Sequence, residues 1–268
     1  MAHSCSRTFR SAALRTLILA AAFTCAPLAS FLAQGSDAAS QPAMPGAERR
    51  LWLGVYGGAA LPVTMGEFSL LCDDCVFSSG SGMGVEGGLL ATYPLDERWS
   101  VTARIGWGMS QTTYEKEASA LRHVPSGQQV MVAYMRKAVI DLSAVSAYFA
   151  ARWNSGMGAL YVVAGPRVNY NHASNAKETE RIVTPDMVYF ESGTNLVTLY
   201  DGAIGGAVDF QKLGLGLRAG VGYDFAFGPD LIIAPEVGFA LPLLGLSPKH
   251  KTWKIGGLDF VLMAAMRM

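Results

Sequence analysis

Two residues in the second half of the chain could act together as a base and a nucleophile. His172 and Ser174 are two positions apart in the sequence NHASNA, residues 171–176. Side chains two positions apart on a β-strand point to the same face, and an imidazole beside a serine hydroxyl can activate it as a nucleophile. Asp186 or Glu191 could orient the imidazole. The alternative interpretation is a polar loop start without catalytic function.

Two cysteines lie in a second polar segment, Cys72-Asp73-Asp74-Cys75. Cys5 and Cys25 belong to the N-terminal signal described below, so Cys72 and Cys75 are the cysteines expected in the mature chain. In an oxidising compartment we expect them to form a local disulfide. Metal binding by this pair with both aspartates is the alternative, but a second ligand cluster is absent from the sequence. His123 and His250 have no neighbours at ligand spacing, so neither a metal site nor a cofactor is expected.

Isolated charges alternate with apolar residues elsewhere in the chain. Four acids and four arginines show this pattern: Glu86, Arg104, Asp141, Arg167, Arg218, Glu236, Asp259 and Arg267. An unpaired charge in a confined interior is costly. We therefore expect these side chains to form a network of ion pairs inside the folded protein.

The elements that carry these charges are segments in which apolar and small or polar residues alternate. A period of two predicts β-strands with two different faces. Most segments have ten residues or more, whereas strands of soluble proteins average about five or six and a bilayer-spanning strand needs about 9–11. The eight segments are residues 51–61, 82–94, 99–113, 138–153, 159–171, 213–225, 231–241 and 253–268.

The segment LGLGLRAGVGYDF, residues 213–225, shows how the two faces differ. One face carries leucines and the other mostly glycines, which suit the crowded interior of a narrow barrel. The prediction is therefore a barrel with its apolar face toward lipid, and Ile140, Leu142 and Ala144 are expected on that outer face. The alternative is a soluble, lipocalin-like barrel with the apolar face inside.

The connections between these segments alternate in length. Residues 95–98, 154–158 and 227–230 are short turns, and longer loops are predicted at 62–81, 115–136, 172–207 and 242–252. Outer-membrane barrels have short periplasmic turns and long outer loops, so both termini are expected in the periplasm. Aromatic residues near the strand ends predict interfacial girdles: Tyr93, Trp99, Trp153, Tyr170, Tyr223, Phe225 and Trp253.

The composition and the N-terminus agree with a secreted membrane protein. The chain is 51% hydrophobic and only 16% charged, with a formal net charge of zero, so nothing indicates nucleic-acid binding. Residues 1–40 have the basic and apolar regions of a secretory signal, with cleavage near residues 30–40; a membrane-anchor helix is the alternative. Residues 41–49 are expected to be a periplasmic tether and residues 50–268 the barrel.

The order of the segments resembles the small bacterial outer-membrane β-barrel proteins, including the outer membrane protein β-barrel domain group and OmpA-like barrels. The resembling pieces are WLGVYGGAAL, GVEGGLLATYPLDERWSV, LYVVAGPRVNY and LGLGLRAGVGYDF. The resemblance implies an integral outer-membrane protein. The chain departs from the family pattern at its end, Met268, where many such proteins have an aromatic residue, and in VIDLSAVSAYF, which lacks a proline found in many relatives.

The sequence NHASNA also resembles the His-x-Ser-Asn-Ala run of outer-membrane lipid A deacylases. This second resemblance implies that His172 is a base and Ser174 a nucleophile acting on an ester of an outer-leaflet lipid. The segment KETERIVTPDMVYF that follows does not match the glycine- and asparagine-rich segment of those enzymes.

The predicted fold is all-β, an eight-stranded antiparallel up-and-down transmembrane β-barrel in the bacterial outer membrane. The expected function is non-enzymatic, structural or surface-interacting, through extracellular loops. A narrow, low-conductance porin-like channel and a lipid A deacylase-like enzyme are the alternatives. We expect a monomer surrounded by outer-membrane lipid, and the sequence does not identify an extracellular partner.

Overall fold

The computed structural model describes residues 51–71, 76–123, 129–156, 159–184, 190 and 193–268. The predicted signal and tether, residues 1–40 and 41–49, therefore lie outside the described residues. The strands are β1 (Trp52–Met65), β2 (Gly80–Pro94), β3 (Trp99–His123), β4 (Gln129–Asn154), β5 (Leu160–Thr184), β6 (Leu196–Ala203), β7 (Leu213–Tyr223), β8 (Phe225–Ala226), β9 (Leu231–Pro242) and β10 (Lys254–Arg267), with one 3-10 turn, η1 (Ile204–Gly206).

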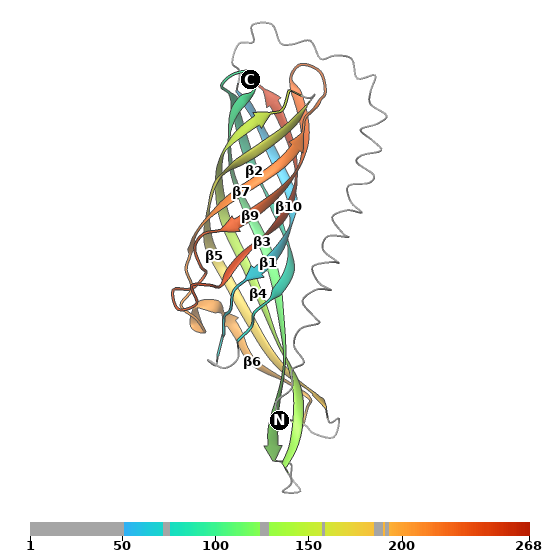
Figure 1. Cartoon of the computed structure of the whole chain (residues 1–268), viewed down its shortest axis with the longest axis vertical. Helices are drawn as coiled ribbons and strands as arrows, with labels where there is room; N and C mark the ends of the chain where they lie inside the picture. The colour runs from blue at the N-terminus through green and yellow to red at the C-terminus, as the bar shows by residue number, and fades with distance from the viewer. Residues whose placement is uncertain (1–50, 72–75, 124–128, 157–158, 185–189, 191–192) are drawn as a thin grey trace, which may run out of the picture. The chain divides into compact units, whose positions relative to one another are not determined.

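Eight strands close into an antiparallel ring in the order β1, β2, β3, β4, β5, β7, β9 and β10 (Figure 1). β10 pairs with β1 along its whole length, from Trp52 opposite Arg267 to Met65 opposite Lys254. The short β8 pairs with β9, and β6 pairs with β5 outside the ring. The predicted eight-stranded antiparallel barrel is confirmed.

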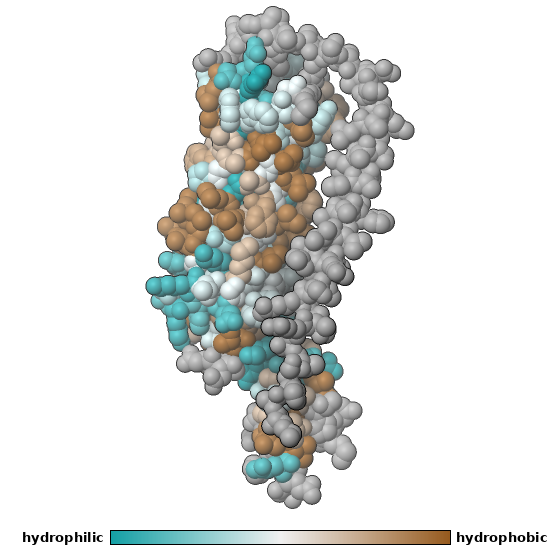
Figure 2. All heavy atoms as spheres, in the orientation of Figure 1, coloured by the Kyte–Doolittle hydropathy of each residue, from teal (hydrophilic) through white to brown (hydrophobic). Residues whose placement is uncertain are grey.

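The two faces of the barrel wall have the predicted character over most of the ring. Outward apolar side chains are widely exposed, for example Leu89 at 62%, Ile105 at 57% and Leu262 at 58%, and they form hydrophobic areas on the barrel wall in Figure 2. A surface of this kind is suited to hydrocarbon rather than to water. Among the described residues, no helix is long and apolar enough to cross a membrane.

Glycines on the inner face make room for large inward side chains. A Cβ atom at Gly222 would overlap the Tyr161 hydroxyl. At Gly238, a Cβ atom would lie only 2.5 Å from Nη2 of Arg218 and 2.6 Å from Oδ1 of Asp259. Cβ atoms do not lie this close to other side-chain atoms in real proteins. Glycine at these positions therefore leaves the space that the inward tyrosine and arginine side chains occupy.

Two of the predicted loops, residues 115–136 and 172–207, are wrong in large part. β3 continues to His123, β4 begins at Gln129, and β5 continues to Thr184, where β6 pairs with it. Figure 1 shows this β3–β4 hairpin projecting beyond the ring. We call β6, together with the parts of β3, β4 and β5 beyond the ring, the outer sheet. Its charged residues led to the loop prediction, but cross-strand pairs such as Glu115 with Lys137, 3.4 Å apart, fit a solvated sheet.

The prediction that Ile140, Leu142 and Ala144 face lipid is also wrong. Ile140 is fully buried and Leu142 is 9% exposed, whereas Val145 and Phe149 on the alternate positions are exposed. The reason is a second apolar region inside the barrel mouth. There, residues from the loops and the strand ends form one core, which we call the plug: Phe68, Leu70, Phe77, Tyr114, Ala138, Ile140, Leu142, Ala176, Ile204, Val208 and Trp253.

Aromatic stacking holds the centre of the plug. The rings of Phe68 and Trp253 are stacked with centroids 4.3 Å apart, and Phe68 meets Tyr114 edge-on at 4.6 Å. Trp253 Nε1 donates a hydrogen bond of 3.3 Å to the Tyr114 hydroxyl. The sequence prediction that Trp253 belongs to an interfacial girdle is therefore wrong. Three other predicted girdle residues, Tyr93, Trp99 and Tyr170, are exposed on the outside of the barrel.

Candidate functional site

An ion pair crosses the bore of the barrel between β3 and β9. Arg104 Nη1 and Nη2 donate to Oε1 and Oε2 of Glu236 at 2.9 and 2.6 Å. Both residues are almost fully buried, at 6% and 2% exposed. β3 and β9 lie opposite each other in the ring order, so this two-point contact spans the interior.

A second arginine extends this pair into a chain of four charges. Arg218 Nη1 donates to Oε1 of Glu236 at 2.5 Å, and Arg218 Nε donates to Oδ2 of Asp259 at 2.9 Å. Tyr161 donates to Glu236 at 3.0 Å. Two guanidinium groups and two carboxylates balance in charge, which offsets part of the cost of removing them from water. We call Arg104, Arg218, Glu236 and Asp259 the belt.

Two further ion pairs lie close to the belt. Arg167 Nη2 donates to Oε2 of Glu86 at 2.8 Å, and its Nε donates to Asn169 at 3.0 Å. Arg152 pairs with Asp224, and its guanidinium lies 3.7 Å from the centroid of the Tyr161 ring. Each of these inner arginines therefore has an acidic partner inside the barrel.

The structure differs from the sequence prediction at two of the eight predicted charges. Asp141 is exposed on the outer face, where Gln111 donates to it at 2.8 Å. It points outward because Ile140 and Leu142 on either side occupy the apolar interior of the plug. Arg267 is half-buried at the opposite end of the barrel and has no ion pair among the described residues. The sequence prediction missed the pair of Arg152 and Asp224, although Asp224 continues the inward glycine face of β7.

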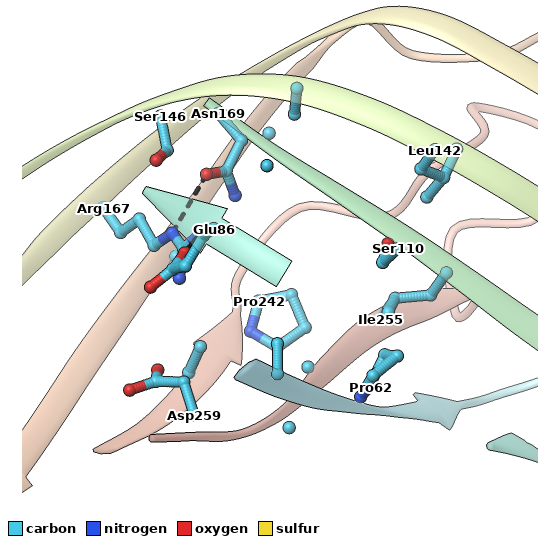
Figure 3. Close-up of a pocket in the computed structure, with 18 of the residues that line it drawn as sticks. Pro62, Glu86, Ser110, Leu142, Ser146, Arg167, Asn169, Pro242, Ile255 and Asp259 are labelled. Carbon is cyan, nitrogen blue, oxygen red and sulfur yellow. Dashed lines mark hydrogen bonds and ion pairs between the residues drawn. The ribbon is translucent and has the colours of Figure 1, made fainter. Parts of the chain in front are cut away.

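A cavity of about 180 Å³ lies between the belt and the plug (Figure 3). Figure 3 shows Glu86, Arg167 and Asn169 grouped on one side of it and Leu142 and Ile255 on the other. This volume is large enough for a cluster of water molecules with polar partners. The bore therefore consists of a charged layer, a small mixed cavity and an aromatic layer.

His172 and Ser174 do not share a face. Ser143 pairs with Ala173 and Ala144 pairs with Asn171, so His172 is an extra residue in β5, a β-bulge. Before the bulge the inward residues have odd numbers, and after it they have even numbers, so that His172 is exposed outside while Ser174 is half-buried opposite Leu142. No hydrogen bond joins the two side chains in the described part of the chain, and the predicted dyad is wrong in geometry.

Several of the predicted site residues cannot be placed. Cys72 and Cys75, the proposed disulfide, lie outside the described residues, as do Asp186 and Glu191, the candidate acids for His172. Within the described ranges, no group of three His, Cys, Asp or Glu residues is arranged to hold a metal ion.

The outer sheet has two open edges. The pairing of β2 with β3 ends where Gly80 lies opposite Tyr114, so among the described residues positions 115–123 of β3 pair only with β4. On the other side, β6 pairs only with β5 within the described chain. An unpaired edge presents backbone N–H and C=O groups that another extended chain can pair with.

Comparisons with known proteins agree with this architecture. The family model described as outer membrane protein β-barrel domain matches residues 33–246. No curated protein matches the chain by sequence. Among solved structures, the Yersinia pestis attachment invasion locus protein Ail is similar at 13% identity, covering 82% of this chain and 99% of that chain with a TM-score of 0.31.

Two other solved barrels are similar to the same degree. Neisserial surface protein A has 12% identity, with 81% of this chain and 97% of that chain covered and a TM-score of 0.32. The outer membrane protease OmpT from Escherichia coli has 8% identity, with coverages of 81% and 96% and a TM-score of 0.31. At these identities the likenesses concern the fold only.

Proposed function

The chain belongs to the outer membrane protein β-barrel domain family, and from this premise we propose that it is a non-enzymatic surface-interaction protein of the bacterial outer membrane. The partner binds the outer sheet by adding an extended segment to its β3 edge, residues 115–123. The observation that carries this proposal is the continuation of β3, β4 and β5 beyond the ring, with residues 115–123 and β6 as open edges.

The chemistry of the edges supports a binding role. Edge pairing supplies backbone hydrogen bonds, while side chains on alternate positions select the partner. Glu115, Lys116 and Glu117 lie along the β3 edge, and charges of this kind restrain pairing between identical edges. Toward the tip, Leu121 and Met131 are each 59% exposed opposite one another. A partner could therefore bind the exposed apolar side chains near the tip while the charges along the β3 edge determine which segments pair with it.

The alternatives have less support. A channel needs a continuous path, and the belt and the plug each cross the bore. A deacylase needs a nucleophile beside its base, and the bulge at His172 separates the two candidate side chains. Mass spectrometry of lipid A from cells with and without Ser174→Ala tests the second alternative. Identical acyl patterns in the two samples support the non-enzymatic proposal. A lipid A acyl chain that is removed in wild-type cells but retained in Ser174→Ala cells contradicts it.

The proposal is tested by removing the hairpin tip while keeping the ring. Replacing residues 117–135 by Asn-Gly joins Lys116 to Arg136, which lie opposite one another, through a two-residue turn. The folded wild-type protein and this variant are panned against an array of extracellular-matrix and serum proteins. We expect at least one interaction that the variant loses.

A matched control separates edge pairing from a general loss of surface. Leu121→Ser with Met131→Ser keeps both edges and removes the apolar tip. Weakened but detectable binding by this control supports edge pairing. Unchanged binding by the shortened variant, or no interaction by the wild type, contradicts the proposal.

A further inference from the structure

We propose that three lysines at the outer rim, Lys212, Lys251 and Lys254, bind the phosphate groups of an outer-leaflet glycolipid. This ligand is different from the partner proposed for the outer sheet, and it involves the opposite side of the ring, where β7, β9 and β10 are neighbours.

Backbone hydrogen bonds bring the three lysines close together. Gln211 N donates to the carbonyl of Leu246, and Leu246 N donates to the carbonyl of Trp253, each at 2.8 Å. Because Leu246 is bonded to both Gln211 and Trp253, Lys212 and Lys254, which follow these two residues, begin near the same loop residue. Flexible four-carbon stems allow their ammonium groups to reach one headgroup.

Lys251 lies in the tight loop between these two lysines. A Cβ atom at Gly245 would be 2.6 Å from the carbonyl oxygen of Lys251, so the two arms of this loop are in contact. His250 N donates to Oγ of Ser247 at 3.4 Å within the same loop. These contacts place the backbone of Lys251 beside that of Gly245, the residue before Leu246.

These lysines differ in their ion pairing from two exposed lysines of the outer sheet. Lys137 pairs with Glu115 at 3.4 Å, and Lys177 pairs with Asp201 at 3.0 Å. Lys212, Lys251 and Lys254 have no ion-pair partner among the described residues.

Acids are also present near the rim. Glu67 lines the same surface hollow as Lys251, and Asp209 is exposed three residues before Lys212. Among the described residues, the three lysines Lys212, Lys251 and Lys254 outnumber these two acids.

The rim lies where lipid headgroups are expected. Leu213 and Leu215 on β7 are 55% and 38% exposed, and Leu243 and Leu244, just before the loop, are 44% and 40% exposed. The apolar wall therefore ends directly beneath the lysines. Figure 2 shows hydrophilic atoms next to a hydrophobic patch at the end of the barrel where, in Figure 1, the loop between β9 and β10 lies. Cations at this height attract phosphate groups.

Binding is measured on the folded full chain by native mass spectrometry in detergent, with diphosphoryl lipid A and its phosphate-free form as probes. Each lysine near a charged lipid surface contributes about fivefold in affinity. The triple variant Lys212→Gln, Lys251→Gln, Lys254→Gln is therefore expected to bind the diphosphoryl lipid about 100-fold more weakly.

The matched control is Lys137→Gln, Lys177→Gln, Arg181→Gln, which removes the same charge from the outer sheet and is expected to keep full affinity. Circular dichroism checks that both variants fold. Equal binding of the two lipid forms, or equal loss in both triple variants, overturns the proposal. Complete displacement of the lipid by millimolar inorganic phosphate overturns the assignment to lipid, because it identifies a general anion site instead.

Discussion

Arg104 and Glu236 meet in the middle of the bore although 132 residues separate them in the sequence. They belong to opposite strands of the ring, and two charge-assisted hydrogen bonds join them. Because β3 and β9 are not neighbours in the sheet, this contact links opposite sides of the barrel wall through its interior.

Removing one arginine from the belt should destabilise the barrel strongly. Arg218→Met leaves Asp259 without its buried partner, and breaking a buried pair on one side costs about 3–5 kcal/mol. Urea unfolding of the refolded protein measures the change. Lys137→Met, which breaks an exposed pair, should cost at most about 1 kcal/mol.

The double variant Arg218→Met with Asp259→Leu completes this test. Because no unpaired charge remains at Asp259, it should recover part of the lost free energy of unfolding. A double variant less stable than the single one would contradict the view that the unpaired carboxylate is the source of the loss.

Trp253 should be a large contributor to the stability of the plug. It is fully buried, stacks on Phe68 and donates a hydrogen bond to Tyr114. Trp253→Ala should cost about 3–5 kcal/mol of unfolding free energy, measured in the same urea titration. Leu121→Ala at the exposed tip should change it by no more than about 0.5 kcal/mol.

The outer sheet should become more stable as the pH falls. Glu178 is fully buried, and both of its carboxylate oxygens lack a hydrogen-bond partner. It lies well past the 9–11 residues of β5 that a bilayer needs. The pKa of this carboxyl group is raised above its ordinary value, mainly because the group is buried. Arg136 offsets part of this shift, and the charge of Glu180 adds to it.

For a carboxyl group with a raised pKa, the folded state holds the proton more tightly than the unfolded state. Stability is therefore highest below the ordinary glutamate pKa and falls as the pH rises toward the folded pKa. Hydrogen exchange of the amides in β5 and β6 between pH 4 and 8 should show this loss of protection. Glu178→Met, which carries no charge, should show almost no such dependence, and a slope equal to that of the wild type would refute the assignment.

The wild-type barrel should conduct no steady current. The belt and the plug cross the bore at two levels, with the cavity between them, so ions have no straight path through the barrel. Planar-bilayer recording measures this directly. Discrete single-channel steps would instead favour the narrow channel.

Alternation alone predicted the ring and most of its interior. Every strand must place apolar residues outward and small or charged residues inward, and this pattern can be read locally in each segment. In β7, every second residue is small or charged, and the structure has Arg218 on the inner face with glycines around it. The inward direction of Arg104, Glu236 and Asp259 follows from the same rule. Which acid each arginine meets depends on the register of strands far apart in sequence, and no local pattern contains that information.

The rule failed where the interior itself becomes apolar. Ile140 and Leu142 obey strict alternation, but hydrophobicity does not distinguish lipid from the plug. The bulge at His172 has no sequence signal of its own, since one extra residue leaves the composition unchanged while reversing every later side chain. The segment beyond Tyr114 predicted a loop because Glu115, Lys116 and Glu117 are consecutive charges, so neither face of the strand is apolar there.

The pairing of β1 with β10 has a consequence for how the protein is assembled. Trp52 lies opposite Arg267, so the seam that closes the ring joins β1 and β10, the first and last strands of the ring in chain order. Until the last strand arrives, both strands keep unsatisfied backbone groups that hydrocarbon does not tolerate. Entry into the bilayer must therefore be delayed, or shielded by a helper, until β10 has been made and exported.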